Sequence, residues 1–182
     1  MAVLMMFLDI DAQRKIENYY KELKENGIYS HCLEFGIQPH ITVGGFRGID
    51  EENIFELAKA KEILKMCCSK IKRFKIRFGH IGIFNHHNPA VFLVPDATEI
   101  LLETHKYLHK TFHDCSVDGD FYCPDRWIPH CTVNEYPDDN VPFDARLNAI
   151  CKSTEYLMKT FEPFEAFVTN MGFDPERFDL IV

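Results

Sequence analysis

The sequence predicts an α+β fold built from two β-α-β-α-β halves, roughly residues 1–84 and 90–173 of a single 182-residue domain. Three observations predict it: the order of the apolar segments, an internal repeat, and one short motif in each half. Hydrophobic residues make up 46% of the chain and charged residues 26%, a balance that gives a globular protein with a sizeable core.

The first half begins with a short apolar run. Ala2 to Leu8 has the length of a buried strand. A helix is expected next, with Asp11 near its start, Gly27 as its end and one apolar face, formed by Ile16, Tyr19, Tyr20 and Leu23. Pro39 to Phe46 then predicts a strand that ends at Gly44-Gly45.

A second helix and a third strand complete this half. Asp50 is a suitable N-cap, and the expected apolar stripe of the helix is Ile54, Leu57, Ala58, Leu64 and Cys68. Apolar residues then alternate with cations, which predicts a strand with one buried and one hydrated face. The apolar residues are Phe74, Ile76 and Phe78, and the cations are Lys75 and Arg77.

The second half has the same order. A strand is expected at Ala90 to Val94, a helix from about Ala97 to His113, and a strand from Pro129. Asn140 and Pro142 open a further helix, whose expected shared face is Phe143, Leu147, Ile150, Cys151, Thr154, Leu157, Met158 and Phe161. Phe164 to Val168 is a last clear strand, and residues 178–182 could add another.

Shifting the sequence against itself by 90 residues aligns the two halves. Eight positions then match: Pro39 with Pro129, His40 with His130, Thr42 with Thr132, Val43 with Val133, Phe46 with Tyr136, Leu57 with Leu147, Phe74 with Phe164, and Gly82 with Gly172. One coincidence means nothing, but eight in one register predict two halves related by approximate two-fold symmetry around one shared cleft.

Composition narrows the range of partners. Twenty Lys and Arg against 28 Asp and Glu leave a net charge of -8, a poor basis for gripping duplex DNA. The run at Ala2 to Leu8 is too short to span a membrane and lacks the basic flank of a signal peptide. The odd number of cysteines, with no CxxC pair, indicates buried thiols of a reducing compartment: Cys32, Cys67, Cys68, Cys115, Cys123, Cys131 and Cys151. We therefore expect a cytoplasmic monomer.

Two short segments carry the candidate chemistry: Pro39-His40-Ile41-Thr42-Val43 and Pro129-His130-Cys131-Thr132-Val133. On a strand, residues i and i+2 point to the same face, so His40 and Thr42 project together, about 6.6 Å apart. Residues between them point to the buried face. Two imidazoles and two hydroxyls are therefore expected to face one another across the cleft.

This set of groups suits a phosphodiester. Histidine titrates near pH ~6.5, so one imidazole can act as base while the other acts as acid. In-line displacement at phosphorus needs a base on the attacking oxygen and an acid on the departing one, and threonine hydroxyls can hold the nonbridging oxygens. No metal or other cofactor is needed. A single His-x-Thr is common and usually has no role, but two copies at equivalent points of a repeat favour a functional site.

The paired H-I-T-V and H-C-T-V segments resemble those of the 2H phosphoesterase superfamily, which contains 2'-5' RNA ligase-like proteins and cyclic phosphodiesterases. The resemblance covers nearly the whole chain and implies antiparallel sheets that form a central cleft, with helices outside. It implies metal-independent opening of 2',3'-cyclic phosphates or cleavage of 2',5'-linked nucleotides. It also makes His40 and His130 catalytic and Thr42 and Thr132 phosphate-binding. Many RNA-end members have a basic residue after the first motif, whereas Gly44-Gly45-Phe46 follows here.

Other residues have weaker claims. Tyr122 and Trp127, which precede the second motif, could stack on a base, although packing roles are equally consistent with them. Arg126 and Arg47 could add charge at the mouth of the cleft. His105, His109 and His113 are spaced for one helical face, but no further ligand completes a metal site. His86-His87 is expected in a loop, and His80 in the core or at the edge of the cleft.

The sequence therefore predicts a phosphoric diester hydrolase that acts on a small nucleotide or on an RNA 3'-end carrying a cyclic phosphate. Two rivals remain open. One is a non-catalytic module that binds nucleotides or RNA ends, and the other is 2'-5' RNA ligation, the reverse reaction.

Overall fold

The computed structural model describes residues 2–46, 54–112, 120–173 and 176–181. Its elements follow the predicted order. The first half contains β1 (Ala2–Leu8), α1 (Ile10–Glu25), α2 (His31–Glu34), β2 (His40–Phe46), α3 (Ile54–Cys68) and β3 (Phe74–Phe84). The second contains β4 (Ala90–Pro95), α4 (Glu99–Thr111), the 3-10 turn η2 (Asp120–Tyr122), β5 (Cys131–Glu135), α5 (Phe143–Thr160), β6 (Phe164–Phe173) and β7 (Glu176–Asp179).

The strands form one seven-stranded antiparallel sheet, not the separate sheets expected from the sequence. Its order is β2-β1-β6-β3-β4-β5, and β7 pairs with β6. The long strands β3 and β6 are the reason for the difference. They pair with each other over Phe74–Phe78 and Phe164–Val168, and beyond that stretch β3 continues along β4 while β6 continues along β1. Hydrogen bonding therefore runs unbroken between the halves.

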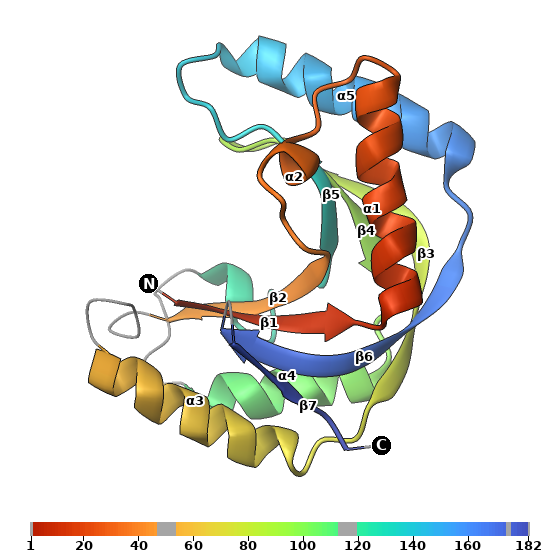
Figure 1. Cartoon of the computed structure of the whole chain (residues 1–182). Coiled ribbons are helices and arrows are strands. Elements are labelled where there is room, and N and C mark those ends of the chain that lie inside the picture. The colour runs from red at the N-terminus through yellow and green to blue at the C-terminus, as the bar shows by residue number, and fades with distance from the viewer. Residues whose placement is uncertain (1, 47–53, 113–119, 174–175, 182) are drawn as a thin grey trace.

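The two ends of this sheet come together. β2 and β5 are the terminal strands of the order, yet they contact each other, and their ends meet near the centre of the molecule (Figure 1). The sheet must bend strongly to allow this contact. Bulges increase local twist and bending, and the β1–β2 and β4–β5 ladders each contain a register shift. Both His-x-Thr segments lie at the seam that results.

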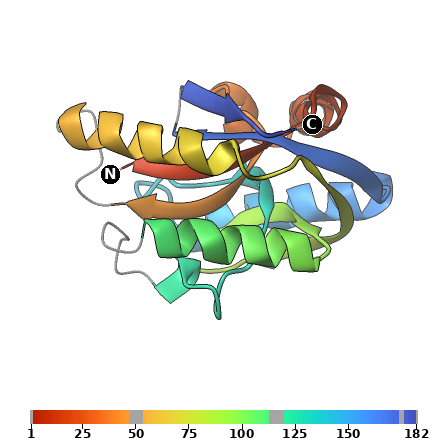
Figure 2. The same cartoon turned by 90° about the horizontal axis from the view of Figure 1, so that it is seen from below.

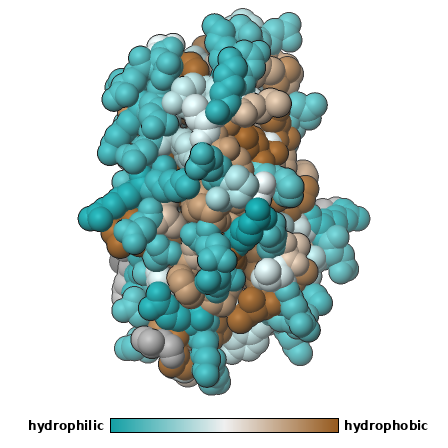
Figure 3. All heavy atoms as spheres, turned by 90° about the vertical axis from the view of Figure 1, so that its right-hand side faces the viewer, coloured by the Kyte–Doolittle hydropathy of each residue, from teal (hydrophilic) through white to brown (hydrophobic). Residues whose placement is uncertain are grey.

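The helices cover the sheet in two groups. α3 and α4 lie below the sheet in Figure 1 and side by side toward the viewer in Figure 2, while α1 and α5 lie on the opposite side of the molecule (Figure 1). The core is one continuous cluster that includes residues of both halves. On the side of the molecule shown in Figure 3, apolar side chains lie between hydrophilic margins. In the described part of the chain, no helix is long and apolar enough to cross a membrane.

Several local predictions are confirmed. The apolar face expected for α1 is buried, and the helix ends just before Gly27, which has a φ of 70° that suits glycine. Asp11 lies in its first turn, as expected, and its N-cap is Asp9, whose carboxylate accepts from the Ala12 amide. On β3, Phe74, Ile76 and Phe78 are buried and the cations between them are exposed. The expected cap Asp50 lies outside the described residues.

The predicted helix faces are less accurate. On α5 the buried residues are Arg146, Ile150, Ser153 and Leu157, whereas Met158 and Cys151 of the predicted face are exposed. Polar residues take these buried positions because they have partners there: Arg146 donates to the His87 carbonyl, and Ser153 accepts from Asn134. On α3, Ala60 is buried in place of Ala58. The short elements α2 and η2 were not predicted.

Candidate active site

Both His-x-Thr segments have the alternation that the sequence predicts. In β2, His40 and Thr42 are half-buried, whereas Ile41 and Val43 are fully buried. In the second segment His130 and Thr132 are half-buried and alternate with buried residues in the same way. His40 is the first residue of β2, and His130 directly precedes β5. Each imidazole thus lies at the start of a strand, on the face opposite the core.

The two imidazoles are held by the same hydrogen bond. His40 Nδ1 lies 2.8 Å from the carbonyl oxygen of Gln38, and His130 Nδ1 lies 2.8 Å from that of Ile128. A carbonyl only accepts, so Nδ1 carries the hydrogen in both rings. Nε2 is therefore the nitrogen that gains or loses a proton in each motif.

The bent sheet brings the two segments together. The backbone N–H of His40 donates to the Cys131 thiol, while burial raises the pKa of that thiol to about 12. Burial lowers the pKa of His130 below its ordinary value, a hydrogen bond to Ile128 opposes this, and charge repulsion from His40 and His86 lowers it further. Its surroundings therefore favour the neutral form of His130, and His40 is close enough to affect its charge.

Two aromatic donors cross between the halves and fix the threonine backbones. Tyr20 of α1 donates its hydroxyl to the Thr132 carbonyl at 3.1 Å, and Trp127 donates Nε1–H to the Thr42 carbonyl at 3.0 Å. Trp127 is 7% exposed, and its ring stacks on His105 at 3.8 Å. Its indole face is thus covered, and its position is that of a core residue that supports β2.

His105 is part of the same support. It is 1% exposed, and its Nε2 lies 3.1 Å from the Val43 carbonyl. Burial lowers the pKa of His105 to about 4, although hydrogen bonds to the Val43 and Tyr122 backbones raise it. A neutral imidazole that donates to a carbonyl inside the core holds the edge strand β2. His113, the last member of the predicted trio, lies outside the described residues.

His130 lies among aromatic side chains. Its ring centroid is 4.9 Å from that of Phe84, edge to face, and 5.0 Å from that of Phe92. Phe84 also stacks with His86 at 5.3 Å. Gly82 makes room for this cluster, because a Cβ there would lie 2.3 Å from the Phe92 ring. The aromatic cluster of Phe84, Phe92 and His86 explains the burial of His130.

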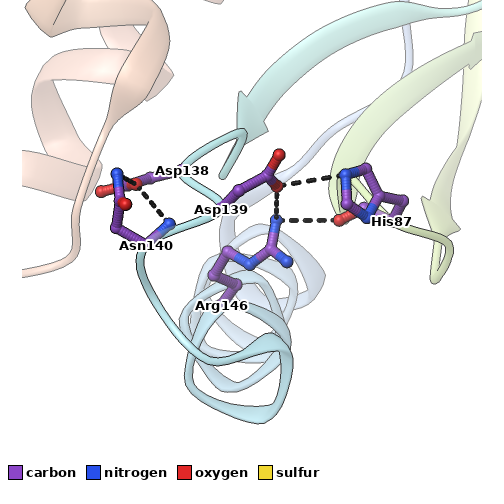
Figure 4. A network of polar contacts seen from close by, with 5 residues as sticks. All are labelled: His87, Asp138, Asp139, Asn140 and Arg146. Carbon is purple, nitrogen blue, oxygen red and sulfur yellow. Dashed lines mark hydrogen bonds and ion pairs between the residues drawn. The ribbon is translucent and has the colours of Figure 1, made fainter.

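A polar network fixes the hairpin that carries this cluster (Figure 4). Arg146 of α5 donates Nη1 to the His87 carbonyl at 2.9 Å and to the Asp139 carboxylate at 3.2 Å, and His87 Nε2 lies 3.1 Å from the same carboxylate. The network ties the β3–β4 hairpin to the loop before α5. His86 is thereby held beside the second motif by its neighbour in sequence.

His40 has a different environment. Its ring lies 6.3 Å from that of Phe7, and the guanidinium of Arg177 lies 3.7 Å above the Phe7 ring. Arg177 also donates to the Gln38 side chain, whose backbone carbonyl holds His40. The sequence analysis did not single out Arg177, because β7 lies far from both motifs in the sequence and takes its place in the sheet by pairing with β6.

The remaining candidates are more peripheral. Tyr122 is half-buried on η2 and packs against the core, and burial raises its pKa. Arg126 and His80 are exposed, and Arg47 lies outside the described residues. Within the described ranges, no group of three or more His, Cys, Asp or Glu side chains is arranged to hold a metal ion.

Comparison with known proteins identifies the family. Residues 12–173 match the 2'-5' RNA ligase superfamily, a span that includes both His-x-Thr segments. The chain belongs to this superfamily. The resemblance to 2H phosphoesterases inferred from the paired motifs is thereby confirmed.

A solved structure supports the fold of this superfamily member. The chain is similar to Usb1 from Kluyveromyces marxianus, with a TM-score of 0.53, 9% sequence identity, and coverage of 100% of this chain and 97% of that one. At this identity the likeness concerns the fold alone. No curated protein matches the sequence.

Proposed function

We propose that this superfamily member is a metal-independent phosphodiesterase that acts on 2',3'-cyclic phosphates, 2',5'-linked nucleotides or RNA ends. One observation carries the proposal. The two motif histidines have the same Nδ1 hydrogen bond to the carbonyl two residues earlier, and they lie close enough for their charges to interact. Two imidazoles with matched orientation and separate environments suit paired acid and base roles.

The environments support an assignment of those roles. His130, whose neutral form is favoured by burial, is the base that takes a proton from the attacking water or hydroxyl. His40, when protonated, gives its proton to the departing ribose oxygen. One P–O bond forms as the other breaks, and one proton moves at each side. Thr42 and Thr132 donate hydrogen bonds to the nonbridging oxygens, where negative charge increases in the transition state.

The strand order supports a pseudo-symmetric cleft between the motifs. Exchanging β1, β2 and β3 with β4, β5 and β6 leaves the order β2-β1-β6-β3-β4-β5 unchanged, apart from its direction of reading. The aromatic donors also cross reciprocally, one from each half to the threonine of the other. In this arrangement, the phosphate lies between the halves, and the substrate extends on both sides of it.

The test is turnover of a substrate panel after exhaustive EDTA treatment. The panel contains 2',3'-cyclic mononucleotides, 2',5'-linked oligomers and RNA with a cyclic-phosphate end. We expect hydrolysis that persists in EDTA and has a bell-shaped pH dependence. Tight binding without turnover supports a binding module instead, and joining of supplied ends supports ligation. Activity that EDTA removes and zinc or manganese restores would overturn the two-histidine mechanism.

A further inference from the structure

Two rows of side chains cross the sheet beside the first motif. Directly opposed residues of antiparallel strands lie on the same face. The pairings place Thr42, Met5, Gly172 and Arg177 in one row across β2, β1, β6 and β7. His40, Phe7, Asn170 and Asp179 form the adjacent row. Arg177 therefore lies on the same sheet face as His40 and Thr42, with a glycine as its neighbour on β6.

The Arg177 side chain extends over this face toward His40. Its guanidinium lies 3.7 Å from the centroid of Phe7, the residue paired with His40. One arm donates to Gln38 Oε1, Gln38 Nε2 donates to Gln13 Oε1, and Gln13 Nε2 donates to the Leu8 carbonyl. These three successive hydrogen bonds each join a donor to an acceptor, so they fix the orientation of the guanidinium.

The fixed guanidinium is incompletely satisfied by the protein. Its Nε is buried and has no hydrogen-bond partner among the described residues. Within that same part of the chain, no carboxylate forms an ion pair with Arg177. A half-buried cation without a counter-charge lowers stability, and an unpaired buried N–H adds to this. An anion with several acceptor oxygens that binds the guanidinium supplies the missing counter-charge.

A second unpaired atom lies on the neighbouring strand. Among the residues that the structure describes, the buried Asn170 Oδ1 has no hydrogen-bond partner, and Asn170 lies directly opposite Phe7. Asn170 Oδ1 can accept a hydrogen bond from a hydroxyl of a ligand, and the nearby Arg177 guanidinium can bind a phosphate. A ribose phosphate offers both groups at once.

We propose that Arg177, oriented by Gln38, binds a second phosphate of the substrate, next to the one that His40 and His130 act on. This inference rests on the proposed function and narrows its substrate class to nucleotides that carry a phosphate besides the scissile one, such as RNA ends. The cation comes from β7, at the other end of the sequence.

The test compares two substrates that differ by one phosphate. These are a nucleoside 2',3'-cyclic phosphate with a free 5'-hydroxyl and the same compound with a 5'-phosphate, which stands for the link to a preceding nucleotide. We expect wild-type kcat/KM to favour the 5'-phosphorylated compound by about ten- to one-hundred-fold, the usual range for a charged hydrogen bond. In R177Q this preference should be lost, mainly through KM.

The ratio of the two kcat/KM values does not depend on the fraction of active enzyme, so partial misfolding does not imitate the effect. R73Q is the matched control, because Arg73 also lies over a phenyl ring, that of Phe167, 4.9 Å from its centroid. It removes the same charge and should retain the preference. Equal kcat/KM values for the two compounds in the wild type overturn the inference but leave the proposed function standing. A preference for the 5'-phosphorylated compound that survives in R177Q does the same. No turnover of either compound or of the wider panel overturns the function itself.

A measurement on the wild type alone covers the case in which R177Q does not fold. A nucleoside 3',5'-bisphosphate should inhibit at least about tenfold more tightly than the corresponding 3'-monophosphate. Equal inhibition by the two compounds contradicts a second anion site.

Discussion

The two His-x-Thr regions have the same backbone arrangement but differ in the side chains that surround their histidines. In the first, Thr42 is opposite Met5, which is opposite Gly172. In the second, Thr132 is opposite Phe92, which is opposite Gly82. Each row thus has a threonine, an apolar residue and a glycine, and the two glycines are those that the 90-residue shift aligns.

The space beside each glycine is used differently. Next to Gly172, the guanidinium of Arg177 lies over Phe7 and interacts with Gln38. At Gly82, the ring of Phe92 fills the space that a side chain would take and packs against His130. The surroundings of His40 therefore include a charged and an amide side chain besides the Phe7 ring, whereas those of His130 are aromatic.

This difference teaches how a repeat of nearly identical motifs can support two roles. A base must be neutral before reaction and an acid must be protonated, so the two imidazoles need unequal environments. Aromatic burial favours the neutral form of His130. The repeated backbone sets the shared geometry, and the residues beside it set the difference.

The largest expected effect is loss of either imidazole. We expect His40→Ala and His130→Ala each to lower kcat by about 10²- to 10⁴-fold, the usual contribution of general acid–base catalysis. Steady-state rates on an active substrate measure this loss, and thermal unfolding should show that both variants remain folded. Retention of more than about a tenth of the rate by one variant would show that its region is not catalytic.

Gly82→Ala tests whether the aromatic environment positions His130. Its Cβ would lie 2.3 Å from the Phe92 ring, so the ring must move and His130 with it. We expect activity to fall by about tenfold to a hundredfold, since small displacements of catalytic groups have effects of this size.

Gly79→Ala is the matched control on the same strand. Its Cβ would approach only the ends of Arg77 and Asp96, which are exposed, flexible and able to move aside. Activity should change little. Equal losses in the two variants would indicate general damage to β3 rather than displacement of His130.

The fold was largely predictable because its elements carry local signals. Apolar runs, caps and the glycine after α1 placed most strands and helices in the right order. The single sheet was not predictable, because it depends on the length of β3 and β6, and both continue past their regular alternation into residues of mixed polarity. Ile150 and Leu157 on the buried face of α5 were predicted, but Arg146 and Ser153 were missed because their polar partners come from distant segments.

For the candidate site, too, local features were predictable from the sequence and contacts between distant segments were not. The alternation of half-buried His40, Thr42, His130 and Thr132 with buried residues was predictable because it is a local property of a strand, whereas their role in catalysis stays a prediction. The sequence could not show that Trp127 supports β2, because that role depends on stacking with His105 from α4. Arg177 and the aromatic cluster at Phe84 come from segments that strand pairing, not sequence, brings beside the motifs.

The threonines should show a smaller and more equal effect than the histidines. We expect Thr42→Ala and Thr132→Ala each to reduce kcat/KM by about five- to tenfold, because each removes one neutral donor to the phosphate among several. Thr→Ser at each position keeps the hydroxyl and should recover most of the rate. A much larger loss at one threonine would show that the phosphate is held mainly by one half.

The smallest expected effect is a change in the pKa of His130 itself. Phe84→Ser removes a ring 4.9 Å from His130 and admits water, so the pKa of His130 should rise toward its ordinary value. His40→Asn removes a like charge and should raise the same pKa by a smaller amount, since burial is the larger cause.

Titration of the His130 ring protons by NMR measures the pKa directly, whereas a limb of the pH–rate profile belongs to the coupled pair. Phe167→Ser, at an exposed ring of β6, is the control and should leave the titration unchanged. In Phe84→Ser the acid limb of kcat/KM should move to higher pH, because a base with a higher pKa is protonated at higher pH. An unchanged His130 titration in Phe84→Ser would mean that the aromatic cluster does not cause the difference between the two regions.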